Sequence, residues 1–290
     1  MQTLDGLQVL RFVAAFLVVI YHVQLGSAGV ENFQGIFDFV QRGAAGVDIF
    51  FVISGFIIML TMIRKPGFDV KNFGLNRFFC IYPTCWVFLT LAIILGYASY
   101  RLTGHSATYD MLSPSSLLVS YLLIPVQTQI FPVAWTLTLE ISFYLIFCLF
   151  YWLMGLRGVI AYGTAVGGFF DGIGVGREFK WGLPAALLIY GAVGIPWKAP
   201  RFAILAGDSS YILYLMHPLL IATVNVLSAR LLGINASTHN GLIILILVLS
   251  VLISMAMTTW IERPYIAWYK RRLAQFSGSA KRAMSRAGSR

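Results

Sequence analysis

The sequence predicts an all-α, polytopic membrane protein, a bundle of about eight transmembrane helices. Of its 290 residues, 59% are hydrophobic and 11% are charged, whereas soluble domains carry roughly 25% charged residues. The mean hydropathy is +0.80, and several charge-free runs reach the about 20 residues that a helix needs to cross a bilayer. Residues 1–274 are therefore expected to form one membrane domain, and the Ser-, Gly- and Arg-rich residues 275–290 a basic, disordered tail.

The spans are expected, in chain order, at residues 12–30, 47–63, 78–100, 133–154, 158–170, 181–197, 209–229 and 241–261. The first is not expected to be a cleaved signal peptide, because it lacks a basic start and a small-residue cleavage site. Met111–Ile130, which Pro114 and Pro125 interrupt, is expected to enter the membrane and return. In an alternative with the same number of crossings, Met111–Ile130 crosses, the short, glycine-rich segment Gly158–Phe170 does not, and the helix that carries Glu140 is reversed.

The basic residues predict the orientation. Arg64, Lys65, Lys71 and Arg77 lie between the second and third spans, and seven more lie from Lys270 onward. Because Lys and Arg are enriched in cytoplasmic loops, we expect both termini to be cytoplasmic. The net charge of +10 then reflects topology and attraction to the anionic lipid bilayer. No nucleic-acid partner is expected.

Arg11 and His22 lie in the first span, eleven residues apart. This separation returns them to within roughly 20° of one helix face, about 16 Å apart along the axis. Ionisable groups so deep in a span indicate function, and a snorkelling arginine with a hydrogen-bonded histidine is the structural alternative. Ala14, Ala15 and Val18 share this face and would let a helix or a ligand approach closely.

Asp48 and Ser54 lie in the run Gly-Val-Asp-Ile-Phe-Phe-Val-Ile-Ser-Gly-Phe, residues 46–56, which begins on the outer side near His22. A buried aspartate there would orient an imidazole or balance its proton. Alternatively, Asp48 caps a helix or occupies its first turn. Arg77, at the inner mouth of the third span, would bind phosphate or carboxylate or serve only as a positive-inside anchor.

Two later runs carry further polar residues. Glu140 lies inside the apolar run from Trp135 to Tyr144, with Tyr144 one turn further along the same face. The preferred topology puts Glu140 in the outer half of the membrane, and carboxylates within spans face a cavity or a partner. In the run 207–218, Ser209 or Ser210 is expected to cap a helix.

His217 lies near mid-membrane, just before Pro218 and one turn after Tyr214. It either serves function or hydrogen-bonds the carbonyls that a helix proline leaves free. Glu262 closes the last span, at the inner face where Arg11 is expected.

The ionisable residues of the spans divide into an inner set (Arg11, Arg77, Glu262) and an outer set (His22, Asp48, Glu140). A transporter would use such a path, and so would an enzyme that joins a cytoplasmic donor to an acceptor outside, with His22 as general base. The chain has no Gly-x-Ser-x-Gly elbow, Walker loop or His-Glu-x-x-His motif, which argues against soluble hydrolases, NTPases and zinc proteases. Its cysteines, Cys80, Cys85 and Cys148, show no metal-ligand spacing, and no metal site is expected.

Together these motifs resemble the integral membrane acyltransferase family 3, whose members O-acylate sugars of bacterial envelope and extracellular polysaccharides. The matching motifs are Arg-x10-His at 11–22, the run at 46–56, Trp-Thr-Leu-x-x-Glu-x-x-Phe-Tyr at 135–144, Ser-Tyr-x-Leu-Tyr-Leu-x-His at 210–217 and Glu-Arg-Pro at 262–264. Five motifs in this order make the resemblance specific. Trp181–Leu188 and Gly207–Tyr211 look most like the exopolysaccharide acetyltransferase branch.

The resemblance implies a bacterial inner-membrane protein with no bound cofactor. Its co-substrate would be an acyl-CoA, usually acetyl-CoA, reached from the cytoplasm, and its acceptor a saccharide, free or polyprenyl-linked. Carried over by position, the catalytic residues would be His22, Asp48 and Glu140. The residues that would bind donor or substrate are Arg11, Ser54, Arg77, Trp135, Tyr144, Ser210, Tyr214, His217 and Glu262. We expect His22 to deprotonate the sugar hydroxyl, which attacks the thioester carbonyl.

The chain departs from the family pattern in two ways. Cys80 stands where the family usually has an arginine, and a cysteine cannot make a bidentate phosphate contact. The family typically has ten membrane helices and about eight are predicted here, with residues 163–176 reading as a junction around missing material. The rival hypotheses are a membrane transporter and a non-catalytic subunit of a polysaccharide assembly or export system.

Overall fold

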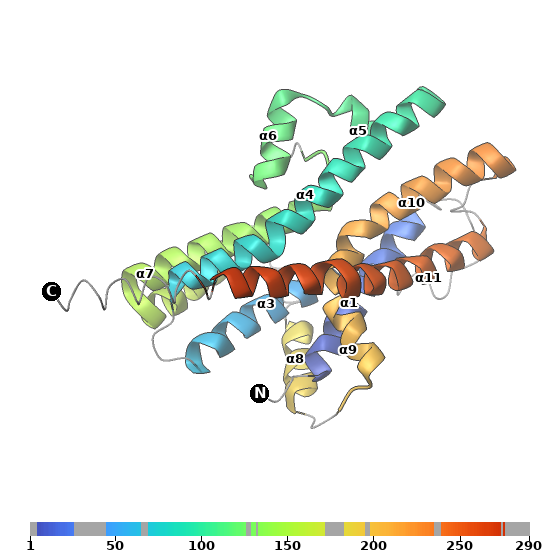
Figure 1. Cartoon of the computed structure of the whole chain (residues 1–290). Helices are drawn as coiled ribbons and strands as arrows, with labels where there is room; N and C mark the ends of the chain where they lie inside the picture. Colours follow the sequence, from blue (N-terminus) through green and yellow to red (C-terminus); the bar gives the residue numbers. More distant parts are fainter. Residues whose placement is uncertain are drawn as a thin grey trace.

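The computed structural model describes residues 5–25, 45–64, 69–125, 129–131, 133–171, 183–194, 198–234, 239–273 and 275. All the regular secondary structure in these ranges is helical (Figure 1). The prediction of an all-α membrane bundle is therefore confirmed. Apart from Gln275, the predicted tail at 275–290 lies outside the described residues.

Six helices in the described ranges are long and apolar enough to cross a bilayer. They are α1 (Asp5–Leu25), α3 (Ala45–Arg64), α4 (Val70–Thr103), α7 (Ala134–Asp171), α10 (Ser210–Leu232) and α11 (Asn240–Met257). The helix that begins with α11 continues through a π-helical turn at Thr258–Glu262 to Leu273. These helices account for six of the eight predicted spans.

The other two predicted spans are not among these six helices. Gly158–Phe170 lies in the part of α7 that follows Gly155, whose φ of 62° and ψ of −148° interrupt the helix. Residues 181–197 contain α8 (Leu183–Gly194), whose 12 residues extend only about 18 Å. A full span covers roughly 30 Å of hydrocarbon. Ala185 and Ile189 of α8 instead join a buried apolar cluster with α1 and α3.

The described part of Met111–Ile130 does not form a spanning helix. It holds α6 (Pro114–Leu122), which follows the single turn of α5 (Ala107–Asp110). The Ser113 side chain caps α6, and Pro114 occupies the first turn, where its missing N–H breaks no bond. Trp86 in the middle of α4 donates a hydrogen bond from Nε1 to the Tyr121 carbonyl oxygen over 2.8 Å. The described residues of Met111–Ile130 thus pack against α4, and the entry into the membrane and return stay a prediction.

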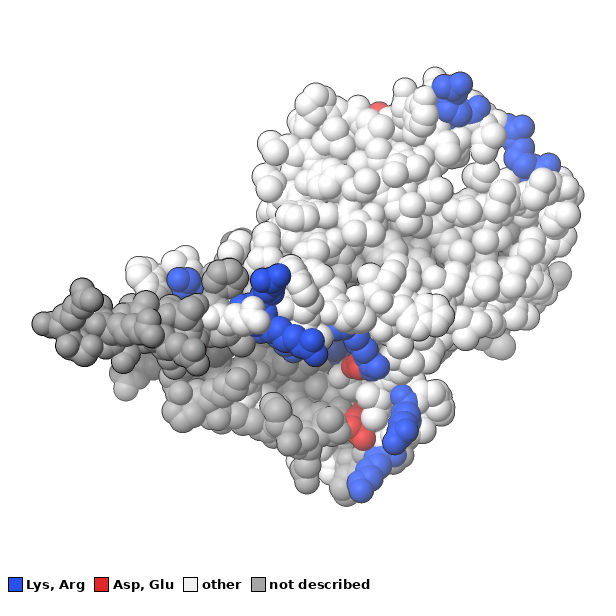
Figure 2. Space-filling view, in the orientation of Figure 1, with Lys and Arg blue, Asp and Glu red and all other residues white. Residues whose placement is uncertain are grey.

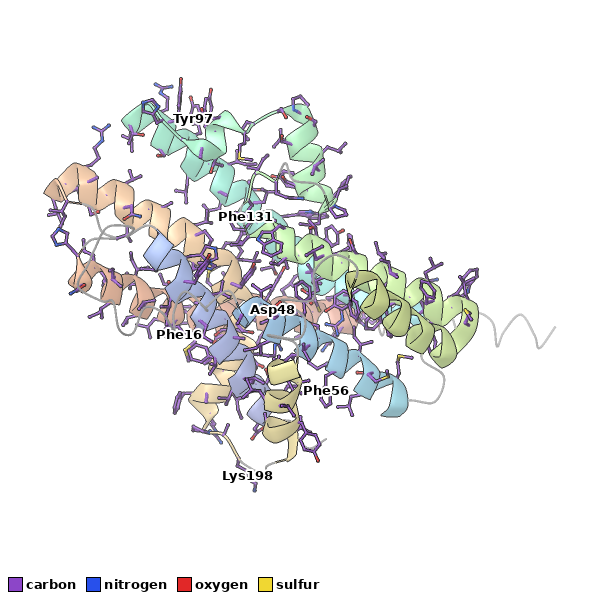
Figure 3. The ribbon with its side chains drawn as sticks, turned by 180° about the vertical axis from the view of Figure 1, so that it is seen from behind. Phe16, Asp48, Phe56, Tyr97, Phe131 and Lys198 are labelled. Atoms are coloured by element: carbon purple, nitrogen blue, oxygen red, sulfur yellow. The ribbon has the colours of Figure 1, made fainter. Side chains whose placement is uncertain are left out.

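Helix α1 lies at the centre of the bundle, in contact with α3, α8, α10 and α9 (Arg201–Asp208) (Figure 1). A Cβ added to Gly46 on α3 would lie 2.3 Å from the Ala14 carbonyl oxygen, so α1 and α3 pack almost backbone to backbone. Figure 3 shows Asp48 near the start of α3, beside α1. The small residues predicted on one face of α1 therefore permit close helix packing.

Candidate active site

A charged cavity of about 430 Å³ opens beside the N-terminal half of α1. Its charged lining comes from five helical segments: Arg11, Arg77, Glu140, Asp208, Glu262, Arg263 and Lys270. Figure 2 shows basic side chains over α9 and the last turns of the α11 segment, with acidic side chains among them. Arg11, Arg77 and Glu262, which the sequence predicts at one side of the membrane, are thus brought together.

Aromatic rings hold the two arginines at the charged cavity. The guanidinium carbon of Arg77 lies 4.9 Å from the ring centroid of Tyr144 and 5.2 Å from that of Phe73. The guanidinium carbon of Arg11 lies 5.6 Å from the ring centroid of Phe50. Such cation–π contacts fix the position of a guanidinium without using up its N–H donors. Both arginines line the cavity with donors that a phosphate or carboxylate can accept from.

Glu140 lies in the charged cavity and not beside His22, which corrects the predicted division into inner and outer sets. Its Oε1 atom accepts hydrogen bonds from Ser54 Oγ, over 3.2 Å, and from the Tyr144 hydroxyl. Glu140 lies at a different depth than predicted because the chain runs back along α4 before α7 begins. Ile130 N donates to Ser120 Oγ in buried surroundings, and Glu140 follows less than three turns later.

The π-helical turn at Thr258–Glu262 brings polar side chains to the charged cavity. Both Thr258 and Glu262 line it. Among the described residues, no hydrogen-bond partner satisfies the buried Thr258 hydroxyl or Glu262 Oε2. Next to them, Arg263 forms an ion pair of 2.7 Å with Asp208. Single π turns often occur at functional sites, and here the turn brings a carboxylate to the wall of the charged cavity.

A narrow slot of about 30 Å³ continues from the charged cavity along α1. The two cavities share Phe50, Glu140 and Tyr211 as lining residues. The remaining slot lining includes the small stripe of α1 and polar groups of α7 and α10: Ala14, Ala15, Val18, Thr136 and Tyr214. The Tyr214 and Thr136 hydroxyls are hydrogen-bonded over 2.6 Å, so the end of the slot is held by α7 and α10 together.

His22 and His217 lie one helical turn beyond the slot. Their ring centroids are 4.9 Å apart and the ring planes are tilted by 56°. His22 Nδ1 hydrogen-bonds the Val18 carbonyl over 2.9 Å, and His217 Nδ1 hydrogen-bonds the Leu213 carbonyl over 3.2 Å. Because a carbonyl only accepts, each neutral ring carries its proton on Nδ1 and a lone pair on Nε2. That lone pair is what a general base requires.

The remaining predicted residues lie apart from these features. Asp48 is half-buried in the first turn of α3, and the Nδ1 partner of His22 is a backbone carbonyl rather than a carboxylate. Trp135 is 46% exposed and lines neither cavity. Ser209 occupies the N-cap position of α10, as predicted, but its side chain makes no cap bond, and Ser210 Oγ has no partner among the described residues. The roles assigned to all these residues stay predictions.

Sequence reasoning missed several residues that line the two cavities. Asp208, Tyr211 and Arg263 belong to the same sequence motifs as the predicted site residues Ser210 and Glu262. Their place in these motifs could have indicated that they also line the site. Lys270 had been assigned only to the basic tail, yet it lines the charged cavity beside Cys80. Thr258 gave no signal, because a π turn has no sequence signature of its own.

Comparisons with known proteins agree with the geometry. Acyltransferase MdmB of Streptomyces mycarofaciens is 34% identical over 154 residues, 51% of this chain and 39% of that protein. Peptidoglycan O-acetyltransferase OatA of Listeria monocytogenes is 31% identical over 96 residues, 32% of this chain and 13% of that protein. The chain thus matches less than half the length of either relative. No solved structure matches it.

Residues 4–170, more than half of the chain, match the acyltransferase domain family (Acyl_transf_3). The chain therefore belongs to the family 3 membrane acyltransferases.

Proposed function

We propose that the chain is a membrane O-acyltransferase that moves an acetyl group from acetyl-CoA to a sugar hydroxyl of an exopolysaccharide or its lipid-linked precursor. One observation carries the proposal. Along one face of α1, Arg11 lines the charged cavity, Ala14, Ala15 and Val18 line the slot, and His22 follows one turn later. A donor site, a channel and a base thus follow one another over about 16 Å.

The charged cavity suits the nucleotide end of acyl-CoA. Arg11, Arg77 and Lys270 offer N–H donors to phosphate oxygens, and Glu262 Oε2 offers an acceptor to an N–H or O–H group of the donor. Lys270 supplies a positive charge beside Cys80, where the family usually has an arginine.

The slot suits the thin pantetheine arm, whose thioester lies at its tip. Its volume of about 30 Å³ is close to the share of one water molecule in the liquid. Entry of the arm therefore requires the slot to widen, and the side chains of Phe50 and Tyr214 border it where movement would open it. A slot that opens only for the arm would also keep water away from the thioester.

His22 would act as the general base. Its Nε2 lone pair takes the proton of the acceptor hydroxyl, and the oxygen attacks the thioester carbonyl. The carbon–sulfur bond then breaks, and the proton returns from His22 to the leaving thiolate. The products are the sugar ester and free CoA, so the reaction balances without an oxidant, a metal or a bound cofactor.

The acceptor is inferred from the name of a relative, and the orientation from the placement of the basic side chains. OatA, which is named a peptidoglycan O-acetyltransferase, supports a saccharide acceptor. Figure 2 shows a small group of basic side chains where α4 and α10 end, opposite the larger group at the charged cavity. Arg101 and Arg230 occupy the last turns of these helices. Placing the larger group inside gives a bacterial inner-membrane protein with both termini cytoplasmic. Polysaccharide assembly proteins are further proposed partners.

The test replaces His22 in cells that make the polysaccharide. We expect membranes with the wild-type chain to transfer radiolabelled acetyl groups from acetyl-CoA to glycan, and His22→Gln to lower the rate by about 10²–10⁴-fold. The exposed His105→Gln serves as matched control and should keep wild-type activity. Transfer that survives in His22→Gln would rule out the proposed base. A wild-type chain that moves solute and never acylates glycan would establish the transporter instead.

A further inference from the structure

The histidine pair contains one group that the proposed reaction does not use. His217 is 0% exposed, and its Nε2 atom has no hydrogen-bond partner among the described residues. A buried acceptor without a donor destabilises the folded protein, because its desolvation is not compensated. Its Nδ1 bond to the Leu213 carbonyl explains why the ring is held in the helix. It does not explain why a lone pair is kept in a dry site.

The ring of His22 is the neighbour that can supply the missing donor. The ring centroids are 4.9 Å apart, so turning the His22 ring toward His217 can bring the two Nε2 atoms within hydrogen-bonding reach. In the neutral state both Nε2 atoms are acceptors and cannot bond each other. Once His22 takes a proton on Nε2, it becomes a donor, and the His217 lone pair is the acceptor it needs.

The surroundings of the pair make such an acceptor valuable. The buried residues packed around this part of α1 and α10 are aliphatic: Val19, Val23, Leu213 and Ile246. The other rings in contact are those of Tyr21 and Tyr214. An imidazolium in apolar surroundings is unstable unless it is hydrogen-bonded, and a neutral imidazole solvates it without adding a second charge.

We propose that His217 is a positioning residue that accepts a hydrogen bond from protonated His22. The inference rests on the proposed function. The hydroxyl proton moves to His22 Nε2 as the carbon–oxygen bond forms. The acylated oxygen then no longer competes for that proton, and the His22 ring turns so that the new N–H donates to His217 Nε2. When the carbon–sulfur bond breaks, the same proton passes to the thiolate, and His217 stays neutral throughout. The pair thereby keeps the proton from returning to the acceptor oxygen.

The kinetic test compares two substitutions of His217 with a control on the same helix. We expect His217→Leu to lower kcat by about 10- to 100-fold, the effect of losing a hydrogen bond to a charged group, with an unchanged KM for acetyl-CoA. His217→Gln keeps an acceptor and should restore part of the rate. Thr223→Val removes a similar bond to a carbonyl four residues back, Thr223 Oγ1 to Leu219 O at 2.7 Å, and should stay at the wild-type rate.

A spectroscopic test does not depend on activity. The chain has four histidines, His22, His105, His217 and His239, and single substitutions assign their ¹⁵N-labelled side chains in nanodiscs. As the pH is lowered, the Nε2–H proton of His22 should appear far downfield in the wild-type chain and in Thr223→Val. It should move upfield in His217→Leu.

The outcomes separate this inference from the proposed function. If His22→Gln abolishes transfer but His217→Leu keeps the wild-type kcat and the His22 signal, the positioning role is wrong and the function stands. If no variant or wild-type chain transfers acyl groups, the proposed function fails. The downfield signal alone then decides whether the two imidazoles share a proton.

Discussion

The two ends of the α1 face that carries Arg11 and His22 differ in charge and in the polarity of their surroundings. At the Arg11 end, a cavity of about 430 Å³ gathers charged side chains from five helical segments. At the His22 end, two imidazoles meet among aliphatic side chains, and each Nδ1 bonds a backbone carbonyl. Eleven residues of one helix join the two environments.

Under the proposed function, the two ends would have separate tasks. Charged groups around a wide cavity that water can enter bind a charged ligand reversibly, because water screens them and completes their hydrogen bonds. A base in a dry site gains more from each correctly placed partner, because a low dielectric strengthens hydrogen bonds. Variants at the charged cavity should therefore change KM for the donor, variants at the histidine pair should change kcat, and variants between them should change both.

The largest effect is expected where the two ends are joined. In Gly46→Ala the new Cβ would lie 2.3 Å from the Ala14 carbonyl oxygen, so α1 and α3 must separate. Overpacking of this kind destabilises by about 1–3 kcal/mol, and the slot between the two ends should deform. We expect a lower thermal unfolding temperature in detergent, a lower kcat and a higher KM.

Gly55→Ala on the same helix is the matched control for Gly46→Ala. A Cβ at Gly55 meets no atom within 4 Å, and alanine favours a helix interior by roughly 1 kcal/mol. This variant should be at least as stable as the wild-type chain. Equal unfolding temperatures for the two alanine variants would contradict the close crossing of α1 and α3.

An intermediate effect is expected at the donor end. Arg77→Gln removes a guanidinium that lines the charged cavity over the Tyr144 ring. Loss of a charge-assisted hydrogen bond to phosphate should raise KM for acetyl-CoA about tenfold, with kcat close to wild type. The rise should shrink at high salt, because salt screens the wild-type contact. A change in kcat alone would place Arg77 at the chemical step.

The smallest effect on KM is expected at Tyr144, where two substitutions separate the role of the ring from that of the hydroxyl. Tyr144→Phe keeps the ring beneath Arg77 and removes only the hydroxyl that donates to Glu140. Tyr144→Leu removes both. We expect KM for acetyl-CoA to rise less than about threefold in the phenylalanine variant and about three- to tenfold in the leucine variant, which loses the cation–π contact. The same KM in both variants would assign the effect to the hydroxyl.

Local properties of the helices could be predicted from the sequence. The positions of Arg11 and His22 on one face follow from the helical period, which depends only on their spacing. Six spans were found because apolar length is a local signal. The motifs also marked both histidines, although their roles remain untested.

Contacts between distant segments could not be predicted. Glu140 was expected near His22, but the return of the chain along α4 starts α7 at a different depth. The pairing of His22 with His217 joins residues far apart in the chain through the packing of α1 against α10. Contacts between helices depend on how the whole bundle packs. The sequence of either helix alone shows no pattern that predicts them.

The most direct test of the two-ended site maps where each end of the donor lies. One acetyl-CoA analogue carries a diazirine in the acyl group, and a second carries an azide on the adenine. We expect the acyl probe to label α1 or α10 near His22 and His217, the adenine probe to label the Glu262–Lys270 segment, and free CoA to compete with both. Labelling of Glu262–Lys270 by the acyl probe, or labelling that CoA does not reduce, would contradict the two-ended site.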